Sequence, residues 1–386
     1  MSFTLRLNTG AWSRHLDAVN AATSSHARMI PVVKGNGYGL GQVRLATEAT
    51  RMRSGCIAVG TVFELEGILD AFAGDVVVLE PFEPRDPSAA RAWAQVRERS
   101  DAQRVIRTIS RPSALEAVRG GDGMNRVLIE ARGSMQRFGM DERELLSALA
   151  GTSVRSAIND GRLVVEGLTL HLPMAQPADE ESGRGGVPMS PRAREVCRWA
   201  GLWLAEISGW SAQSASAAVI WASHLSDAEL AIVAASTPGI ELKSRVGTRL
   251  WLGDRTVLTA QGTVLAVHPL PSGTHVGYRQ RTGPRDGTLV VVSGGTGHGI
   301  GLSAPSPATS ARQRVVAAGT GALEAAGRSM SPFTWAGGQR WFAEPPHQHH
   351  SMIWLPRGCV IPAVGDQMPA DVRFTTTRFD EVIEIS

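Results

Sequence analysis

Lysine and tyrosine are the residues that this chain most clearly lacks. Its 386 residues include only two lysines, Lys34 and Lys243, and two tyrosines, Tyr38 and Tyr278. Arginine carries nearly all the remaining positive charge, and a guanidinium neither loses its proton nor condenses with a carbonyl as an amine can. A lysine that is kept against this background suggests an amine with a chemical role.

Cysteines and long apolar runs are also scarce. The three cysteines, Cys56, Cys197 and Cys359, lie far apart, which argues against a disulfide framework or a zinc knuckle. No stretch reaches the roughly 18 apolar residues that a membrane span needs. The first residues lack the basic and apolar regions of a signal peptide. We therefore expect a soluble, cytoplasmic protein with no membrane partner.

Charge of one sign is not in excess. The chain has 39 basic and 36 acidic residues, a net charge of +3, and no dense basic block with interleaved aromatic residues. This pattern argues against nucleic-acid binding. A hydrophobic content of 43% is that of a globular protein, and a small-molecule partner is compatible with it.

Apolar runs alternate with helical patterns over the first two thirds of the chain. Strands are expected at 27–33, 56–60, 76–79, 104–108, 126–130, 164–171 and 217–222. Helices are expected at 42–52, 62–71, 113–118, 141–149 and 191–204. Continuous apolar strands alternating with helices favour a parallel (β/α)8 barrel of the TIM type over residues 10–240. Catalytic residues should then lie at the carboxyl ends of its strands.

The alternation of strand and helix patterns ends after residue 240. Strand patterns at 257–269, 288–293, 351–356 and 374–385 are separated by turns rich in glycine and proline, with one helical pattern at 310–328. We predict a second, mostly β domain over 241–386, joined by an N-terminal strand at 1–9. Residues 173–188 are predicted to form an exposed loop over the barrel mouth.

Lys34 lies where an apolar run opens into glycines, in the string PVVKGNGYGLG of residues 31–41. An isolated loop lysine is more often an ordinary turn residue, but here Lys34 and Tyr38 can converge on one ligand. The string resembles the cofactor-lysine motif of the alanine racemases, VVKANAYGHG. That resemblance implies that Lys34 binds pyridoxal 5'-phosphate and serves as one catalytic base, and that Tyr38 contacts the phosphate.

A second segment, GSMQRFG at 133–139, resembles GMGRLG of the same family. The resemblance implies that Arg137 binds the cofactor and the substrate carboxylate, for which a planar guanidinium is suited. Glu130 stands seven residues earlier, where many racemases carry a carbamylated lysine, and is expected to orient Arg137. The alternatives are a solvated loop arginine and an ordinary ion pair.

Two further segments, GLTLHL at 167–172 and SRVGTRLW at 244–251, resemble a racemase strand that ends in histidine and the racemase string VRFGIAMY. They imply that Arg245 faces the pyridine nitrogen and that His171 supports Arg245. A lone histidine at a strand end is more often a satisfied core residue. An arginine at that nitrogen would weaken the electron sink that decarboxylases and aminotransferases need.

The same family resemblance implies that backbone amides around Gly247 and Thr248 bind the phosphate, together with a serine near the end of the seventh barrel strand. Ser223 and Ser226 are both candidates, and Ser223 is preferred because Ser226 begins a capping-box pattern. Hydroxyls and amides at the ends of barrel strands commonly bind phosphate.

The segment THVGYR at 274–279 resembles the racemase string VSYG. It implies that Tyr278 is the second base and that it acts in the partner subunit's site, so a homodimer with shared active sites is expected. A phenol with an ordinary pKa of about 10 needs help to act near neutrality. The alternative is an ordinary tyrosine at a hairpin.

The C-terminal part departs from the racemase pattern. Gly294 stands where the family has an entryway tyrosine, and HQHH at 347–350 is the best match to CMDQ, which places Gln348 near the substrate. These changes suggest an amino-acid substrate larger or more polar than alanine. Glu344, His347, His349 and His350 could bind a metal, but we predict none because the resemblance places them at the mouth of the partner subunit's active site.

Together these features predict a pyridoxal-phosphate-dependent amino-acid racemase or epimerase that moves the α-proton between two bases. Two alternatives are a racemase homologue that binds the cofactor without turnover and a decarboxylase of the same two-domain plan.

Overall fold

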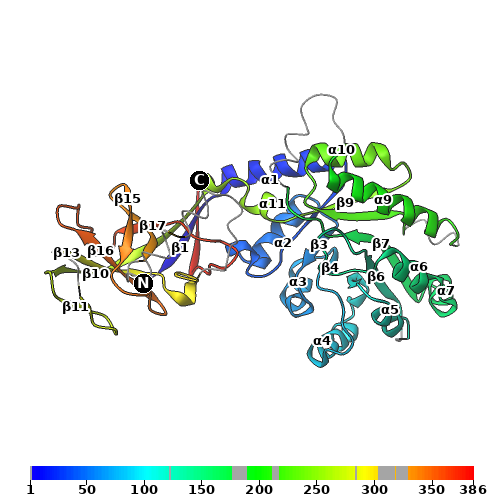
Figure 1. The fold of residues 1–386 in the computed structure, drawn as a ribbon, viewed down its shortest axis with the longest axis horizontal. Coiled ribbons are helices and arrows are strands. Elements are labelled where there is room, and N and C mark those ends of the chain that lie inside the picture. The colour runs from blue at the N-terminus through cyan, green and yellow to red at the C-terminus, as the bar shows by residue number, and fades with distance from the viewer. Residues whose placement is uncertain are drawn as a thin grey trace. The chain divides into compact units, whose positions relative to one another are not determined.

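The structure, a computed structural model, describes residues 2–120, 123–175, 189–210, 217–282, 285–302, 318 and 329–386 (Figure 1). Contacts divide the chain into two units, which we call the barrel unit (residues 15–37 and 41–253) and the β unit (residues 1–14, 38–40 and 254–386). Within the described ranges, no helix is both long and apolar enough to cross a membrane.

Eight parallel strands form the sheet of the barrel unit, in the order β2-β9-β8-β7-β6-β5-β4-β3. A bridge between Val32 and Ala58, with a 2.8 Å hydrogen bond from the Val33 amide to the Ala58 carbonyl, brings the outer strands together. The barrel is therefore nearly closed, and the predicted fold class is confirmed. Its strands are β2 (Arg28–Pro31), β3 (Cys56–Val59), β4 (Asp75–Val78), β5 (Val105–Ile109), β6 (Asn125–Glu130), β7 (Leu163–Leu170), β8 (Val219–Ser223) and β9 (Glu241–Val246).

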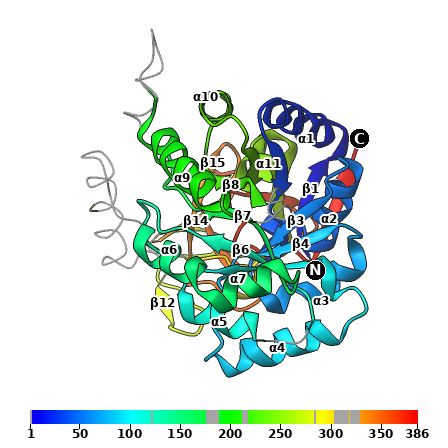
Figure 2. The same cartoon turned by 90° about the vertical axis from the view of Figure 1, so that its right-hand side faces the viewer.

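Helices surround these strands (Figure 2). They are α1 (Thr9–Ser24), α2 (Gln42–Arg51), α3 (Leu65–Ala71), α4 (Pro87–Glu98), α5 (Pro112–Arg119), α6 (Glu142–Ala150), α7 (Thr152–Asn159), α9 (Pro191–Ile207), α10 (Asp227–Ser236) and α11 (Thr248–Leu252). Helix α6 shows how the sequence starts such an element: Asp141 and Glu144 form a capping box. Leu145 and Leu149 then face the core at helical spacing.

Short 3-10 turns lie at the ends of several elements. They are η1 (Gly37–Gly39), η2 (Val62–Glu64), η3 (Ala102–Arg104), η5 (Arg255–Val257) and η6 (Thr296–His298).

Small and branched side chains fill the barrel interior. One buried cluster joins Ile30, Val32, Cys56, Ala58, Val77, Ile106, Leu128, Val219 and Trp221. A larger cluster packs strands against helices and includes Trp199 and Trp203 of α9. Trp203 also donates a 2.7 Å hydrogen bond to the Ala217 carbonyl, so its polar atom is satisfied in the core.

The β unit holds a second sheet, in the order β13-β16-β15-β14-β17-β10-β1-β18, in which β10 also pairs with β13. The long strand β10 therefore completes a ring with β13, β16, β15, β14 and β17. Strand β1 runs antiparallel to β10 and parallel to β18. The strands are β1 (Phe3–Asn8), β10 (Leu258–Leu270), β13 (Gly287–Ser293), β14 (Met330–Trp335), β15 (Gly338–Phe342), β16 (His350–Pro356), β17 (Gln367–Ala370) and β18 (Glu381–Ile385).

Some predicted elements differ from the structure. Strand β18 covers only the end of the predicted strand at 374–385, because the amides of Thr376 and Thr377 turn back to the Arg373 carbonyl. Phe379 there stacks on Phe3 with ring centroids 5.4 Å apart. The helical pattern at 310–328 and residues 176–188 of the predicted loop lie outside the described residues.

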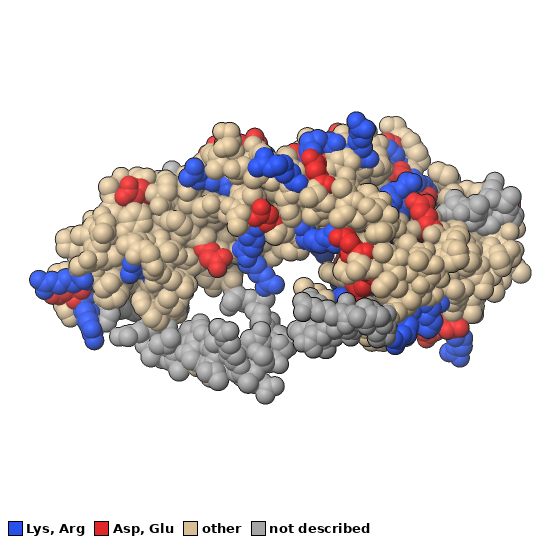
Figure 3. Space-filling view, turned by 90° about the horizontal axis from the view of Figure 1, so that it is seen from above, with Lys and Arg blue, Asp and Glu red and all other residues tan. Residues whose placement is uncertain are grey.

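Basic and acidic side chains are interspersed on the face drawn in Figure 3, with no broad area of one sign among the described residues there. Many form ion pairs within the barrel unit. Arg126 of β6, for example, bonds to Asp75 of β4, two strands away, and to Glu166 of the adjacent strand β7, at 2.7 Å each.

Candidate active site

Lys34 lies just after β2, at the carboxyl end of the barrel, as the motif predicted. The loop around it is fixed by Glu64 of η2, whose Oε2 accepts hydrogen bonds from the amides of Gly35 (3.2 Å) and Gly60 (2.8 Å). Gln42 donates a third, 2.8 Å long, to the same oxygen. The loops after β2 and β3 are thereby joined by one carboxylate.

The amine of Lys34 stands among cations. Burial by the barrel mouth lowers its pKa from the ordinary value, and Arg137 and Arg245 lower it further, while Glu64 opposes them. A lysine in these surroundings gives up its proton more readily than a solvated one. Lys34 is therefore suited to act as a nucleophile or a base.

Arg137 and Glu130 come from the end of β6 and the loop that follows it. Arg137 is exposed, with its guanidinium 5.1 Å from the centroid of the Phe138 ring. Glu130 is buried, and its Oε2 has no hydrogen-bond partner among the described residues. Burial raises the pKa of Glu130 to about 7, although Arg245 and Arg137 both favour its ionised form. The expected orientation of Arg137 by Glu130 stays a prediction.

Arg245 is a buried arginine at the end of β9. It donates a 2.6 Å hydrogen bond from Nη2 to the Leu170 carbonyl. Its Nε, also buried, has no partner among the described residues. Burial lowers the pKa of Arg245 to about 10, Glu130 opposes this, and Arg137 adds to it. Arg245 is thus held by a backbone carbonyl through Nη2, and its Nε is not used in that contact.

His171 and Ser223 meet at the ends of β7 and β8. The Nδ1 of His171 lies 3.0 Å from the Ser223 hydroxyl, which also accepts a 3.4 Å hydrogen bond from the Leu172 amide. Burial, followed by the charges of Arg245 and Arg137, lowers the pKa of His171 to about 3. His171 is therefore neutral at physiological pH. Ser223 is buried and already bonded, so its predicted contact with phosphate stays a prediction.

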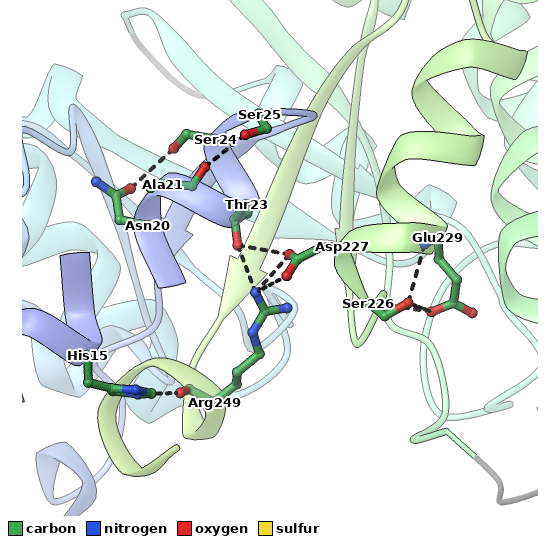
Figure 4. A network of polar contacts seen from close by, with 10 residues as sticks. All are labelled: His15, Asn20, Ala21, Thr23, Ser24, Ser25, Ser226, Asp227, Glu229 and Arg249. Atoms are coloured by element: carbon green, nitrogen blue, oxygen red, sulfur yellow. Dashed lines mark hydrogen bonds and ion pairs between the residues drawn. The ribbon is translucent and has the colours of Figure 1, made fainter. Parts of the chain in front are cut away.

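Arg249 of α11, which directly follows Gly247 and Thr248 in the chain, is fixed by several polar contacts (Figure 4). Arg249 donates to both carboxylate oxygens of Asp227 at 2.7 Å and to the Thr23 hydroxyl at 3.3 Å. Its own carbonyl accepts a 3.1 Å hydrogen bond from His15. Figure 4 also shows Ser226 and Glu229 in a capping box at the start of α10. The hydroxyl of Ser226, the second candidate for the phosphate site, is therefore engaged in capping this helix.

Sequence reasoning missed two residues at the barrel mouth. No role was assigned to Glu64 or to His224 from the sequence. His224 adopts a left-handed φ of 62° directly after β8, and its ring lies 5.1 Å from that of His171, edge to face. A histidine immediately after a barrel strand was the available signal for His224. Glu64 had no such signal, because its contacts are made by approach of another loop.

The second lysine has a different environment. Lys243 of β9 places its amine 4.5 Å from the centroid of the buried Trp221 ring, a cation–π contact. Trp221 in turn donates a 2.9 Å hydrogen bond to the Glu166 carbonyl. Lys243 therefore has a packing role, whereas Lys34 is the lysine with a lowered pKa near the strand ends.

Three of the predicted site residues belong to the β unit. Tyr278 lies in the hairpin turn between β11 (His275–Val276) and β12 (Arg281–Thr282), and it is 86% exposed. Gln348 is exposed, and its carbonyl accepts a 2.8 Å hydrogen bond from the Gly297 amide. Tyr38 is buried and has a φ of 56°. The roles of these residues stay predictions.

The remaining site residues share the barrel unit. Strand ends bring together Lys34, Glu130, Arg137, His171, Ser223, Arg245, Gly247 and Thr248. Among the residues that the structure describes, no group of three or more histidine, cysteine or acidic side chains could hold a metal ion.

Solved structures with the same fold include alanine racemases and a histidine racemase. The alanine racemase from Bartonella henselae with covalently bound pyridoxal phosphate aligns with a TM-score of 0.65 at 14% identity, over 100% of both chains. The enzyme from E. faecalis gives 0.62 at 16% identity, over 95% of this chain and 88% of that one. The histidine racemase from Leuconostoc mesenteroides subsp. sake gives 0.61 at 15% identity, over 99% and 97%.

Comparison at the level of sequence gives the family. No curated protein matches the chain. The family model of the alanine racemase N-terminal domain, however, matches residues 7–231, which is more than half of the chain and includes most of the barrel strands. The chain therefore belongs to the alanine racemase family.

Proposed function

We propose that the protein is a pyridoxal-phosphate-dependent amino-acid racemase or epimerase in which Lys34 and Tyr278 move the α-proton. The observation that carries this proposal is the environment of Lys34, an amine with a lowered pKa that faces Arg137 and Arg245 at the ends of barrel strands. When bound, pyridoxal phosphate draws electrons from the α-carbon and so acidifies its hydrogen.

The donor set at the barrel mouth fits this cofactor. Lys34, Arg137 and Arg245 are close enough to interact electrostatically, and together they would attract an anionic ligand. In addition, the buried Nε of Arg245 is a hydrogen-bond donor without a partner among the described residues. An arginine supplies no proton to a pyridine nitrogen, because it does not titrate in the physiological range. Arg245 therefore favours racemisation over decarboxylation, which needs a stronger electron sink.

Each residue then has a role of its own. Lys34 holds or releases a proton at Nζ on one face of the α-carbon, and Arg137 pairs with the substrate carboxylate. Tyr278 serves at Oη on the opposite face. Because Tyr278 is 86% exposed on its own chain, a second copy is proposed to receive it, which makes the enzyme a homodimer with shared sites.

The substrate is proposed to be larger or more polar than alanine. Gly294 stands where the family's entryway tyrosine would be, and its φ of 109° disfavours any side chain. A Cβ there would also lie 2.8 Å from the Phe3 ring. The backbone at this position therefore disfavours the side chain of a tyrosine. The presence of a histidine racemase among proteins of this fold also supports substrates beyond alanine.

The test of cofactor binding uses the two lysines as a matched pair. Purified protein with pyridoxal phosphate should absorb visible light, and borohydride reduction with peptide mapping should place the cofactor on Lys34. Lys34→Arg should abolish the absorbance, whereas Lys243→Arg should keep it. Equal loss in both variants would contradict the assignment.

The test of activity is exchange of the α-proton in deuterated water over a panel of amino acids. Exchange accompanied by loss of optical activity supports a racemase. Absorbance without exchange on any member of the panel would leave a binding protein, and release of carbon dioxide would indicate a decarboxylase. A clear optimum for alanine would refute the proposed substrate class.

Shared active sites can be tested by mixing two variants. Lys34→Ala and Tyr278→Phe should each be inactive as homodimers. After subunit exchange, hybrid dimers should contain one intact site, so the mixture should recover up to about a quarter of wild-type activity. No recovery, with hybrid dimers demonstrated, would show that both bases act in one chain.

A further inference from the structure

The turn that carries Tyr278 is built around a buried carboxylate. Glu344 is 2% exposed and accepts hydrogen bonds from the amides of Tyr278 (3.1 Å) and Arg279 (3.4 Å). Gly277 precedes them with a φ of 70°, and a Cβ on it would lie 1.8 Å from the carboxyl carbon of Glu344. Only glycine therefore lets the turn close on this carboxylate.

His347 links the same carboxylate to the tyrosine ring. Its Nε2 is hydrogen-bonded to Oε1 of Glu344. Its ring lies 4.5 Å from that of Tyr278, centroid to centroid, at an angle of 34°. Its Nδ1 lies 3.0 Å from Nε2 of His350, the first residue of β16. Because a carboxylate only accepts, Nε2 of His347 is the donor, and Nδ1 then accepts from His350.

Glu344 is ionised in this arrangement. Burial opposes ionisation, but the hydrogen bonds from His347 and from the amides of Tyr278 and Arg279 outweigh it and hold the pKa of the carboxyl below its usual range. A buried charge that is fully bonded makes a rigid support, because its partners cannot leave without exposing an unpaired carboxylate.

We propose that Glu344, His347 and His350 form a positioning unit that fixes the backbone and the ring of Tyr278. This inference rests on the proposed function for the catalytic role of Tyr278 itself. The three residues act through Tyr278 and are positioning residues. A tyrosine on an exposed hairpin would otherwise sample several rotamers, whereas proton transfer needs the phenol held to a fraction of an ångström.

The geometry can be tested without turnover, because the chain has only two tyrosines. Protein labelled with ¹³C in the tyrosine rings should give two ring signals, and Tyr278→Phe assigns one of them. We expect the signal of Tyr278 to be displaced from that of free tyrosine by the adjacent imidazole ring. His347→Ala should return it to the free position. A Tyr278 signal that does not move in His347→Ala would overturn the proposal.

The effect on proton transfer is tested on each enantiomer separately. The enantiomer whose α-proton exchange is lost in Tyr278→Phe defines the tyrosine side of the reaction. In His347→Ala and Glu344→Gln, exchange from that enantiomer should fall about 10- to 100-fold, since misplacement of a group by about 1 Å can cost that much. Exchange from the other enantiomer, which uses Lys34, should remain within about twofold of wild type.

Controls separate positioning from loss of structure. His268→Ala, on an exposed residue of β10, is the matched histidine variant and should leave both exchange rates unchanged. The double variant of Glu344 and His347 should be no worse than the more affected single variant, because both act as one unit. An equal fall for both enantiomers would overturn the proposal. If wild type exchanges no amino acid, the proposed function fails, while the ring signals still decide the positioning role.

Discussion

The buried carboxyl of Glu130 is expected to make the stability of the barrel unit depend on pH, and Glu130→Gln should remove that contribution. Burial raises the pKa of Glu130 from 4.5 to about 7 against the opposing charges of Arg245 and Arg137. In the unfolded chain the carboxyl ionises at its ordinary value. The folded state therefore binds this proton more tightly than the unfolded state does.

The sign of the effect follows from that difference. The stabilisation is fully present below about pH 4.5 and is lost as the pH rises to about 7, because the unfolded chain ionises first. One pKa unit corresponds to about 1.4 kcal/mol, so the unfolding free energy of wild type should fall by about 2.5 kcal/mol relative to Glu130→Gln between about pH 5 and pH 8. Glu130 is 4% exposed, so solvent screens little of this.

Urea denaturation followed by tryptophan fluorescence measures the difference at each pH. Glu98→Gln, at the exposed last residue of α4, is the matched control and should follow wild type. A constant difference between wild type and Glu130→Gln across this range would refute the raised pKa. A variant that loses stability relative to wild type as the pH rises would show that ion pairs with Arg137 and Arg245 dominate.

Three further outcomes are expected. Gly277→Ala leaves Tyr278 in place but should lower activity at least about 10-fold, because the added Cβ would overlap the Glu344 carboxylate. Exchange rates should be measured beside those of Gly273→Ala, a variant at another turn glycine. Because the pKa of His171 is lowered to about 3, His171→Gln should keep the shape of the pH–rate profile between about pH 5 and pH 8, and a lost inflection would contradict its neutrality. Burial raises the pKa of Cys56 to about 12, so thiol reagents should leave it unmodified in the folded protein and react with it in urea, as peptide mapping would show.

Most barrel strands could be predicted from sequence because they are apolar and bounded by turn residues. Strand β9 escaped notice because its residues Lys243, Ser244 and Arg245 are polar, although Ser244 and Arg245 are buried. Lys243 and Arg245 find their partners, the Trp221 ring and the Leu170 carbonyl, on other strands far along the chain. A local hydrophobic pattern carries no information about such partners.

The same distinction separates the parts of the site. Lys34, Arg137 and Arg245 lie in short local motifs, so the resemblance to the family was enough to select them as candidate site residues. Glu344 contributes through amides more than sixty residues away along the chain, and its partner Gly277 looks like any turn glycine in sequence. The proposed positioning of Tyr278 therefore rests on contacts between the hairpin and the segment before β16, which no local sequence pattern encodes.

The carboxylate of Glu64 has a consequence for motion at the barrel mouth. One of its oxygens, Oε2, accepts hydrogen bonds from an amide of the loop after β2 and from an amide of the loop after β3. The two loops are therefore connected through this oxygen, and movement of either strains the hydrogen bond to the other. The two loops should behave as one cooperative unit in hydrogen exchange, with the Gly35 and Gly60 amides opening together. We expect Lys34, which lies next to Gly35, to gain mobility only when both loops open.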